Sequence, residues 1–206
     1  MVIALHGYEG DTTQWLPVTR ALTAAGRVLI PEAPKPAVLY GRYSRGRSWY
    51  AMQGLGQPEP TNFGDALVAL EQFLLETVEE ATAESEAAPP IVLLGLDQGA
   101  LLALSLACVW PELVSGVAAV GGYLPDIPGW EREDRPLGGM SVLLVHDPDS
   151  ASVPAALQQK TEAELRARGA HVAVHRLAGA RQLPPALTEL VNAWMETTVP
   201  VTVSRP

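Results

Sequence analysis

Short apolar runs alternate along the chain with longer segments in which apolar residues recur at helical spacing. The candidate strands are Val2–Leu5, Val28–Ile30, Ile91–Leu94, Val117–Val120, Val142–Val145 and Val172–Arg176. The candidate helices are Thr13–Ala25, Phe63–Thr82, Gln98–Val109, Pro154–Arg168 and Pro185–Thr197. Because alternating strands and helices build βαβ units, the pattern predicts a three-layer α/β fold around a mostly parallel sheet of about six strands. Continuous apolar runs are typical of strands that are covered on both faces.

The segment 31–61 interrupts this alternation and is rich in proline, glycine, arginine and aromatic residues. Connections of this length in a compact domain are usually active-site lids or binding loops. We therefore expect a single domain over residues 1–206, with a lid-like loop at 31–61.

The composition of the chain argues against several classes of function. The net charge of −9 argues against a general affinity for nucleic acid or for anionic membranes. A single cysteine, Cys108, excludes an internal disulfide framework, and no apolar run reaches the length of a membrane span. Since the first residues read directly into a strand, we expect no signal peptide and a cytoplasmic location.

The third apolar run is followed by Gly95-Leu96-Asp97-Gln98-Gly99 and then by an apolar helix. A strand, a tight turn of the form Gly-X-X-X-Gly and a helix make the nucleophile elbow of hydrolases, in which the middle residue is exposed at the end of the strand. The two glycines avoid Cβ atoms that would clash with neighbouring elements. The backbone N–H of Gln98 points at the same place from the start of the helix.

Residues Gly95 to Pro125 resemble the phospholipase/carboxylesterase group of α/β-hydrolases, which includes the acyl-protein thioesterases. Other segments resemble the same family in chain order. They are Leu5 to Asp11 at the first strand and oxyanion loop, Arg47 to Tyr50 near the mouth of the site, His146 to Pro154 at the acid-bearing loop, and Gly179 to Pro184 at the histidine-bearing segment. The resemblance implies the α/β-hydrolase fold.

The family usually carries a hairpin before its first His-Gly strand, and here Met1 precedes that strand directly. Without the hairpin, Val28–Ile30 is expected to become an edge strand. Because exposed edges are normally paired or covered, we expect a homodimer or a cover formed by the tail segment Val199–Val203.

The resemblance also implies where a serine esterase would carry its catalytic triad. Asp97 stands at the nucleophile position, Ser150 at the acid position with Asp149 beside it, and Arg181 at the histidine position. All three positions depart from the family. Arginine cannot replace the base easily because it stays protonated.

The substitutions at Asp97 and Arg181 are complementary in charge. We expect the two side chains to form an ion pair across the former Ser–His contact, at about 2.7–3.2 Å. Such a pair should lower the pKa of the Asp97 carboxyl together with its nucleophilicity. The oxyanion donors would be the backbone N–H groups of Tyr8 and Gln98.

The histidines do not replace the missing base. His6 belongs to the oxyanion loop, His146 ends a strand, and His171 and His175 lie in or beside the last strand. We interpret each as a structural or surface residue.

Four cations and four aromatic residues gather in the segment 31–61. They are Lys35, Arg42, Arg45 and Arg47, with Tyr40, Tyr43, Trp49 and Tyr50. One interpretation is a site for an anionic small molecule, with Arg45, Arg47, Trp49 and Tyr50 as ligand-binding residues and Trp49 at the pocket wall. The alternative is that the arginines pair with acidic side chains on the surface. We find no metal-ligand spacing and no phosphate-binding glycine loop, and so expect neither a metal nor another cofactor.

Three functions remain open. The chain could be a degenerate, non-hydrolytic member of the family that keeps a small-molecule pocket. It could be an active esterase-like hydrolase that uses Asp97 as nucleophile or base. Finally, it could be an interaction module that pairs through its exposed sheet edge.

Overall fold

The computed structural model describes residues 1–23, 26–39, 41–54, 57–84, 89–129, 135–150 and 153–198. Two features of the sequence interpretation, Tyr40 and the tail segment Val199–Val203, lie outside these residues.

A six-stranded parallel sheet forms the centre of the molecule, in the order β10-β9-β8-β7-β1-β2. Its strands are β1 (Val2–Leu5), β2 (Val28–Leu29), β7 (Val92–Leu96), β8 (Gly116–Val120), β9 (Ser141–His146) and β10 (His171–Arg176). The prediction of a mostly parallel sheet of about six strands is confirmed, and β2 is an edge strand, as expected.

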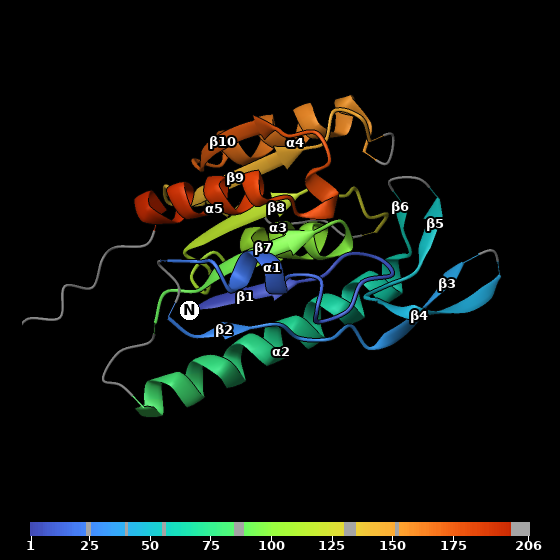
Figure 1. Cartoon of the computed structure of the whole chain (residues 1–206), viewed down its shortest axis with the longest axis horizontal. Helices are drawn as coiled ribbons and strands as arrows, with labels where there is room; N and C mark the ends of the chain where they lie inside the picture. Colours follow the sequence, from blue (N-terminus) through green and yellow to red (C-terminus); the bar gives the residue numbers. More distant parts are fainter. Residues whose placement is uncertain are drawn as a thin grey trace, which may run out of the picture.

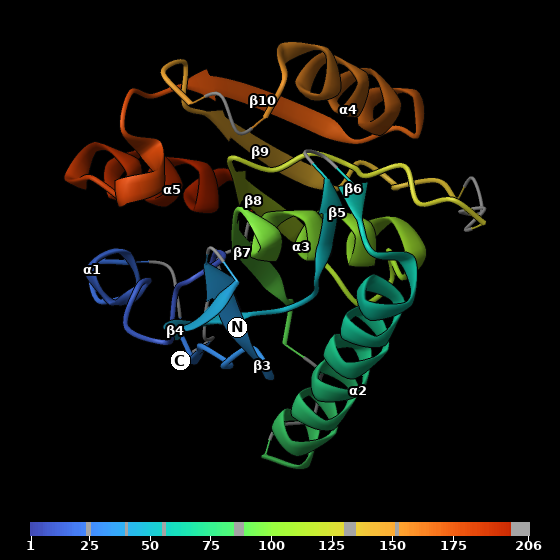
Figure 2. The same cartoon turned by 90° about the vertical axis from the view of Figure 1, so that its right-hand side faces the viewer.

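Helices cover both faces of the sheet (Figures 1 and 2). They are α1 (Leu16–Thr19), α2 (Pro60–Glu84), α3 (Gln98–Val109), α4 (Ala155–Ala167) and α5 (Pro185–Thr198). Alternate residues of each strand face opposite sides, so Ile3 and Leu5 pack towards α2 and α3, whereas Val2 and Ala4 pack towards α1 and α5. None of the helices in the described ranges is both long and apolar enough to cross a membrane.

The predicted helix Thr13–Ala25 is wrong in its extent, because over the described residues 13–23 regular helix is limited to Leu16–Thr19. The residues before it form tight turns, with the Leu16 N–H bonded to the Thr13 carbonyl. Asp11 stabilises these turns by accepting a bond from the backbone N–H of Thr13. Pro17 then removes one backbone donor from the short helix.

The segment 31–61, expected to be an irregular loop, contains short antiparallel strands. β3 (Lys35–Leu39) pairs with β4 (Arg42–Ser48), and β5 (Met52–Gly54) pairs with β6 (Gln57–Pro58). Both hairpins lie together on one side of the molecule (right in Figure 1). The apolar-polar pattern did not reveal them because proline, glycine and arginine interrupt it.

The helix α3 packs very close to the sheet, and glycines make this possible. A Cβ atom on Gly99 would lie 2.3 Å from the carbonyl oxygen of Leu5 in β1. One on Gly95 would lie 2.5 Å from the Cα of Ala100. In both places the obstacle is backbone, which cannot move aside without shifting a whole element. The reason given for the two elbow glycines is therefore confirmed.

We predict that Gly99→Ala destabilises the protein by about 1–3 kcal/mol or more, because the new methyl group would overlap the β1 backbone. Gly64→Ala in α2 is the matched control, since a Cβ there meets nothing within 4 Å. This control should stabilise the protein by about 0.5–1 kcal/mol. Urea unfolding midpoints measure both effects, and an unchanged midpoint for Gly99→Ala would contradict the close-packing argument.

Candidate functional site

Asp97 occupies the turn between β7 and α3 in a conformation that few non-glycine residues adopt. Its φ is 47° and its ψ is −113°. Strained backbone of this kind persists where the surrounding structure holds it, and it is often found at functional sites. The structure therefore has the backbone of a nucleophile elbow, with a carboxylate at its tip.

The Asp97 carboxylate contacts Arg181, which is carried by the short 3₁₀ helix η1 (Ala180–Gln182). The Arg181 Nη2 donates to Oδ2 of Asp97 at 2.5 Å, slightly shorter than the predicted range. The side chains are 15% exposed for Asp97 and 33% exposed for Arg181. The expected ion pair between the nucleophile and histidine positions is thus present.

Two glycines leave room for the carboxylate. A Cβ on Gly7 would lie 3.0 Å from Oδ2 of Asp97, and one on Gly121 would lie 3.3 Å from Oδ1. Gly121 also has a positive φ of 63°. The side chain of Asp97 is therefore enclosed by backbone on two sides and by Arg181.

The prediction that Arg181 lowers the pKa of Asp97 overall is wrong. Burial raises the pKa of the Asp97 carboxyl by more than the Arg181 charge and hydrogen bond lower it. Desolvation opposes the ionised form, and one partly exposed guanidinium does not offset it. The sequence predicts that Arg181 contacts Asp97, but it does not predict how far the two side chains are buried.

The oxyanion role expected for the backbone N–H groups of Tyr8 and Gln98 stays a prediction. Tyr8 and Gln98 both line the cavity described below. Among the hydrogen bonds between described residues, none uses the backbone N–H of Tyr8 or Gln98. The Tyr8 hydroxyl donates to the carbonyl of Val38 at 2.5 Å and accepts from the N–H of Val38 at 3.1 Å, which ties the oxyanion loop to β3.

Gln98 has a second role that the sequence interpretation missed. Its Oε1 accepts from the Trp49 N–H at 2.9 Å, and its Nε2 donates to the Tyr50 carbonyl at 2.8 Å. The Ser48 hydroxyl lies 3.1 Å from the same Oε1. Gln98 therefore holds the segment 48–50 against the elbow. A buried amide directly after the turn was the available signal, because such a group requires partners.

The residues at the acid position do not line the cavity. Asp149 is exposed, and its N–H donates to Oδ1 of Asp147 at 3.1 Å. Ser150 is half-buried, and its N–H donates to the Asp147 carbonyl. In this loop the Asp147 carboxylate is buried, whereas that of Asp149 is exposed.

Neither buried histidine lines the cavity. His6 Nδ1 donates to the Gly7 carbonyl and Nε2 accepts from the Ala33 N–H, an arrangement that fits the neutral ring. Burial lowers the pKa of both His6 and His146. The interpretation of His6 as a structural residue is confirmed by these contacts.

Arg47 and Trp49, expected to bind ligand, make hydrogen bonds to backbone carbonyls and are not among the residues that line the cavity. The Arg47 guanidinium donates to the carbonyls of Ala33 and Pro34 and lies 3.7 Å from the Glu32 carboxylate. The Trp49 indole is buried against His6 and donates to the His6 carbonyl, so Trp49 supports the oxyanion loop from behind and does not form the pocket wall. Arg45 is exposed on β4 and does not line the cavity either. For Arg47 the alternative of pairing with an acidic neighbour describes the structure better.

A cavity of about 880 Å³ opens at the elbow. Asp97, Arg181, Gln98, Tyr8 and Tyr50 line it, as the sequence interpretation expects for a site. Its other lining residues come mainly from the two hairpins and are Lys35, Pro36, Val38, Tyr43, Ser48, Ala51, Met52 and Gly54, together with Leu101, Gly121, Tyr123 and Val153. Most of these side chains are apolar or aromatic, which is typical of small-molecule sites.

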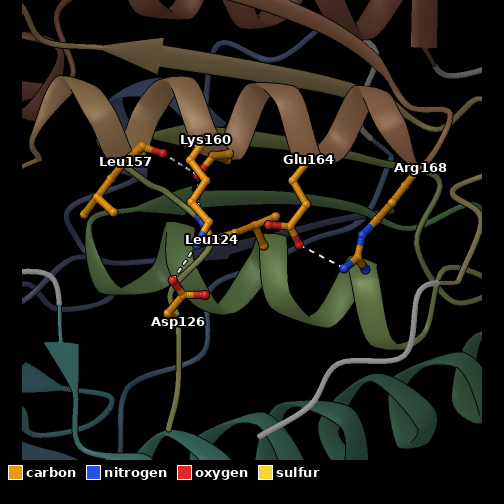
Figure 3. Close-up of polar contacts among 7 residues, drawn as sticks. Leu124, Asp126, Leu157, Lys160, Glu164 and Arg168 are labelled. Atoms are coloured by element: carbon orange, nitrogen blue, oxygen red, sulfur yellow. Dashed lines mark hydrogen bonds and ion pairs between the residues drawn. The ribbon is translucent and has the colours of Figure 1, made fainter.

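Tyr123 was missed by the sequence interpretation. It is buried among the lining residues, and burial raises the pKa of its hydroxyl to about 12. The segment that follows it is anchored to α4, as Figure 3 shows: the Leu124 N–H donates to the Thr161 hydroxyl at 2.8 Å, and Lys160 pairs with Asp126. These contacts fix the cavity wall on the side of α4.

The family model described as phospholipase/carboxylesterase matches residues 1–198. The chain belongs to this family. Acyl-protein thioesterase 1 of Yarrowia lipolytica is 26% identical to this chain over 129 residues, which are 60% of this chain and 57% of that protein. The putative esterase NocK of Nocardia uniformis is 34% identical over 90 residues, or 43% of this chain and 25% of that protein. The chain therefore spans less than two thirds of the length of either relative.

Solved structures share the fold of this family member. The carboxylesterase of Mesorhizobium loti superposes with a TM-score of 0.80 at 17% identity, over 95% of this chain and 87% of that one. The carboxylesterase of Bacillus cereus has a TM-score of 0.77 at 20% identity, over 96% and 88% of the two chains. At these identities the comparison shows the α/β-hydrolase fold.

Asp97 should make stability depend on pH. Because its pKa is raised above the usual value of 3.8, the folded state binds the proton more tightly than the unfolded chain. This contribution to stability is fully present below 3.8 and is lost as the pH rises through the folded-state pKa. We predict that Asp97→Asn, which cannot ionise, gains stability relative to the unchanged protein as the pH rises above 3.8 and through the folded-state pKa of Asp97. Thermal unfolding at a series of pH values measures this trend, with Asp65→Asn, at an exposed residue, as the control. A stability difference between Asp97→Asn and the unchanged protein that does not vary with pH would contradict the prediction.

Gln98→Met should loosen the segment 48–50, because the Trp49 N–H and the Tyr50 carbonyl lose buried partners. We expect a loss of roughly 2–4 kcal/mol in unfolding free energy. Hydrogen exchange at the Trp49 amide should accelerate more than at amides in β8 or β9. Gln72→Met on the exposed side of α2 is the control. Equal exchange rates of the Trp49 amide in Gln98→Met and in this control would contradict the role of Gln98 in holding the segment 48–50.

Proposed function

We propose that this chain is a non-hydrolytic member of the phospholipase/carboxylesterase family that binds a small molecule in the cavity at the elbow. The observation that carries the proposal is the contact between Asp97 and Arg181, the two residues at the nucleophile and histidine positions. The substitutions complement each other, so they replace a reactive pair by a stable ion pair.

The chemistry of the site supports this proposal. A serine mechanism needs a hydroxyl nucleophile and a base that can accept its proton. Asp97 has no such proton to give, and Arg181 remains protonated at physiological pH. No histidine is among the described residues that line the cavity. An Asp97 ester intermediate would therefore lack a histidine to activate the water that hydrolyses it.

Active hydrolysis through Asp97 is the second candidate, and one observation favours it. Burial raises the pKa of Asp97, which brings this carboxyl closer to the range in which a general base or acid works well. In this alternative Asp97 would be nucleophile or base at an elbow whose backbone geometry is intact.

Pairing through the sheet edge has less support. β2 consists of Val28 and Leu29, and a strand of two residues has few backbone groups to offer a second copy. A homodimer stays a prediction. A cytoplasmic location also stays a prediction, in keeping with a buried thiol at Cys108.

Hydrolysis of p-nitrophenyl butyrate tests the proposal. We expect no turnover by the unchanged protein, by Asp97→Ser or by Arg181→His. We expect the double variant Asp97→Ser/Arg181→His to hydrolyse the ester at least 100-fold above background, since the nucleophile and its base are then both present. Adding Ser150→Asp should raise kcat further if the loop can bring that carboxylate to the new histidine.

Two results would overturn the proposal. One is turnover by the unchanged protein that Asp97→Ala abolishes, which would establish the active alternative. The other is turnover that persists in Asp97→Ala, which would place a nucleophile elsewhere. The single variants are matched controls, because each changes one member of the pair and leaves the cavity walls intact.

A further inference from the structure

The charged side chains lining the described part of the cavity are Asp97, Arg181 and Lys35. Asp97 and Arg181 contact each other, so their charges largely compensate. The ammonium group of Lys35 makes no ion pair with a described carboxylate and acts on Glu59 through space, so the cavity wall keeps a positive group where β3 begins.

Lys35 is held by a neutral group. Its Nζ donates to Oδ1 of Asn62 at 2.6 Å, and no carboxylate of the described residues lies within ion-pair distance. Glu59 and Asp65 are both three positions from Asn62 in the sequence. The Glu59 carboxylate accepts the backbone N–H groups of Thr61 and Asn62 at the start of α2. The Asn62 hydrogen bond and, to a smaller extent, the charge of Lys35 lower the pKa of the Glu59 carboxyl. Glu59 is thus occupied by helix capping.

The other lysine, Lys160, shows the usual situation, in which the ammonium group pairs with the carboxylate of Asp126 on the surface. Lys35 differs because it is half-buried, lines a cavity and is hydrogen-bonded to a neutral amide instead of a carboxylate. A partly desolvated ammonium gains most from an anionic partner with which it can form a charge-assisted hydrogen bond.

We infer that the cavity takes an organic anion with an apolar body, and that Lys35 binds its anionic group. This inference rests on the proposed function, since it names the ligand class of the same cavity. Pro36, Val38, Met52, Leu101 and Val153 provide apolar walls for the body of the ligand.

The orientation of the ligand follows from the charges. The Asp97–Arg181 pair is close to neutral, whereas Lys35 has no carboxylate in direct contact, so the anionic group lies at the Lys35 end. The uncharged end of the ligand reaches towards the elbow, where the N–H groups of Tyr8 and Gln98 can donate to a neutral polar atom or remain beside an apolar one. Lys35 is therefore a residue that determines specificity for charge.

A pair of probes of equal chain length tests this inference by isothermal titration at pH 8. Dodecanoate carries the anionic group and dodecan-1-ol carries a neutral one. We expect the unchanged protein to bind dodecanoate about 10-fold or more tightly than dodecan-1-ol, as one charge-assisted hydrogen bond would give. Lys35→Met should remove this preference by weakening dodecanoate binding, with dodecan-1-ol affinity within about twofold of the original.

Two further variants sharpen the test. Arg42→Met is the matched control, because Arg42 is an exposed cation on β4 that does not line the cavity, and both affinities should stay unchanged. Lys35→Arg should keep the preference, since it keeps the charge. The probe comparison on the unchanged protein also decides the matter if Lys35→Met fails to fold.

Equal affinity for the two probes, or an unchanged preference in Lys35→Met, would overturn the inference and leave the binding function standing. Binding of neither probe would overturn the inference and count against the proposed binding function as well. Ester turnover by the unchanged protein would overturn the non-hydrolytic proposal alone.

Discussion

The sharp turn at Asp97 is the constraint on which the rest of the site depends. It requires a backbone conformation that is unfavourable for a residue with a side chain, and it is maintained because α3 packs directly on β1 and β7. Gly95 and Gly99 allow that close packing, since any Cβ at either position would overlap backbone. The turn therefore presents whatever side chain stands at position 97 to the cavity, regardless of its chemistry.

This independence of scaffold and side chain explains how a carboxylate can occupy a hydrolase elbow. The loop after β1, the hairpins and α3 are held together by backbone hydrogen bonds and by the side chains of Tyr8, Trp49 and Gln98, none of which requires a serine at the tip. Arg181 then provides the counter-charge that a buried carboxylate needs. Function can change at such a site while the fold remains that of the family.

The charge of the cavity lining differs between the elbow and the hairpins. The pair of Asp97 and Arg181 is close to neutral at the elbow, whereas Lys35 adds a positive charge towards the hairpins. Apolar residues make up much of the remaining lining. A cavity with this arrangement can distinguish ligands by the charge at one end and by the length of the apolar body, without any covalent step.

The sequence by itself determined the parallel sheet, the elbow and the contact of Asp97 with Arg181, because these depend on local periodicity, on glycines at fixed spacing and on a recognisable order of motifs. Tertiary structure decided what depends on depth and on partners far apart in the chain. It showed that burial outweighs Arg181 in setting the pKa of Asp97, since desolvation is a property of all surrounding elements. It also gave Arg47 and Trp49 backbone partners within the protein and placed Lys35 at the cavity, because the hairpins in 31–61 follow no simple pattern of apolar positions. Tyr123 comes to the same cavity from the segment after β8, far away in the sequence.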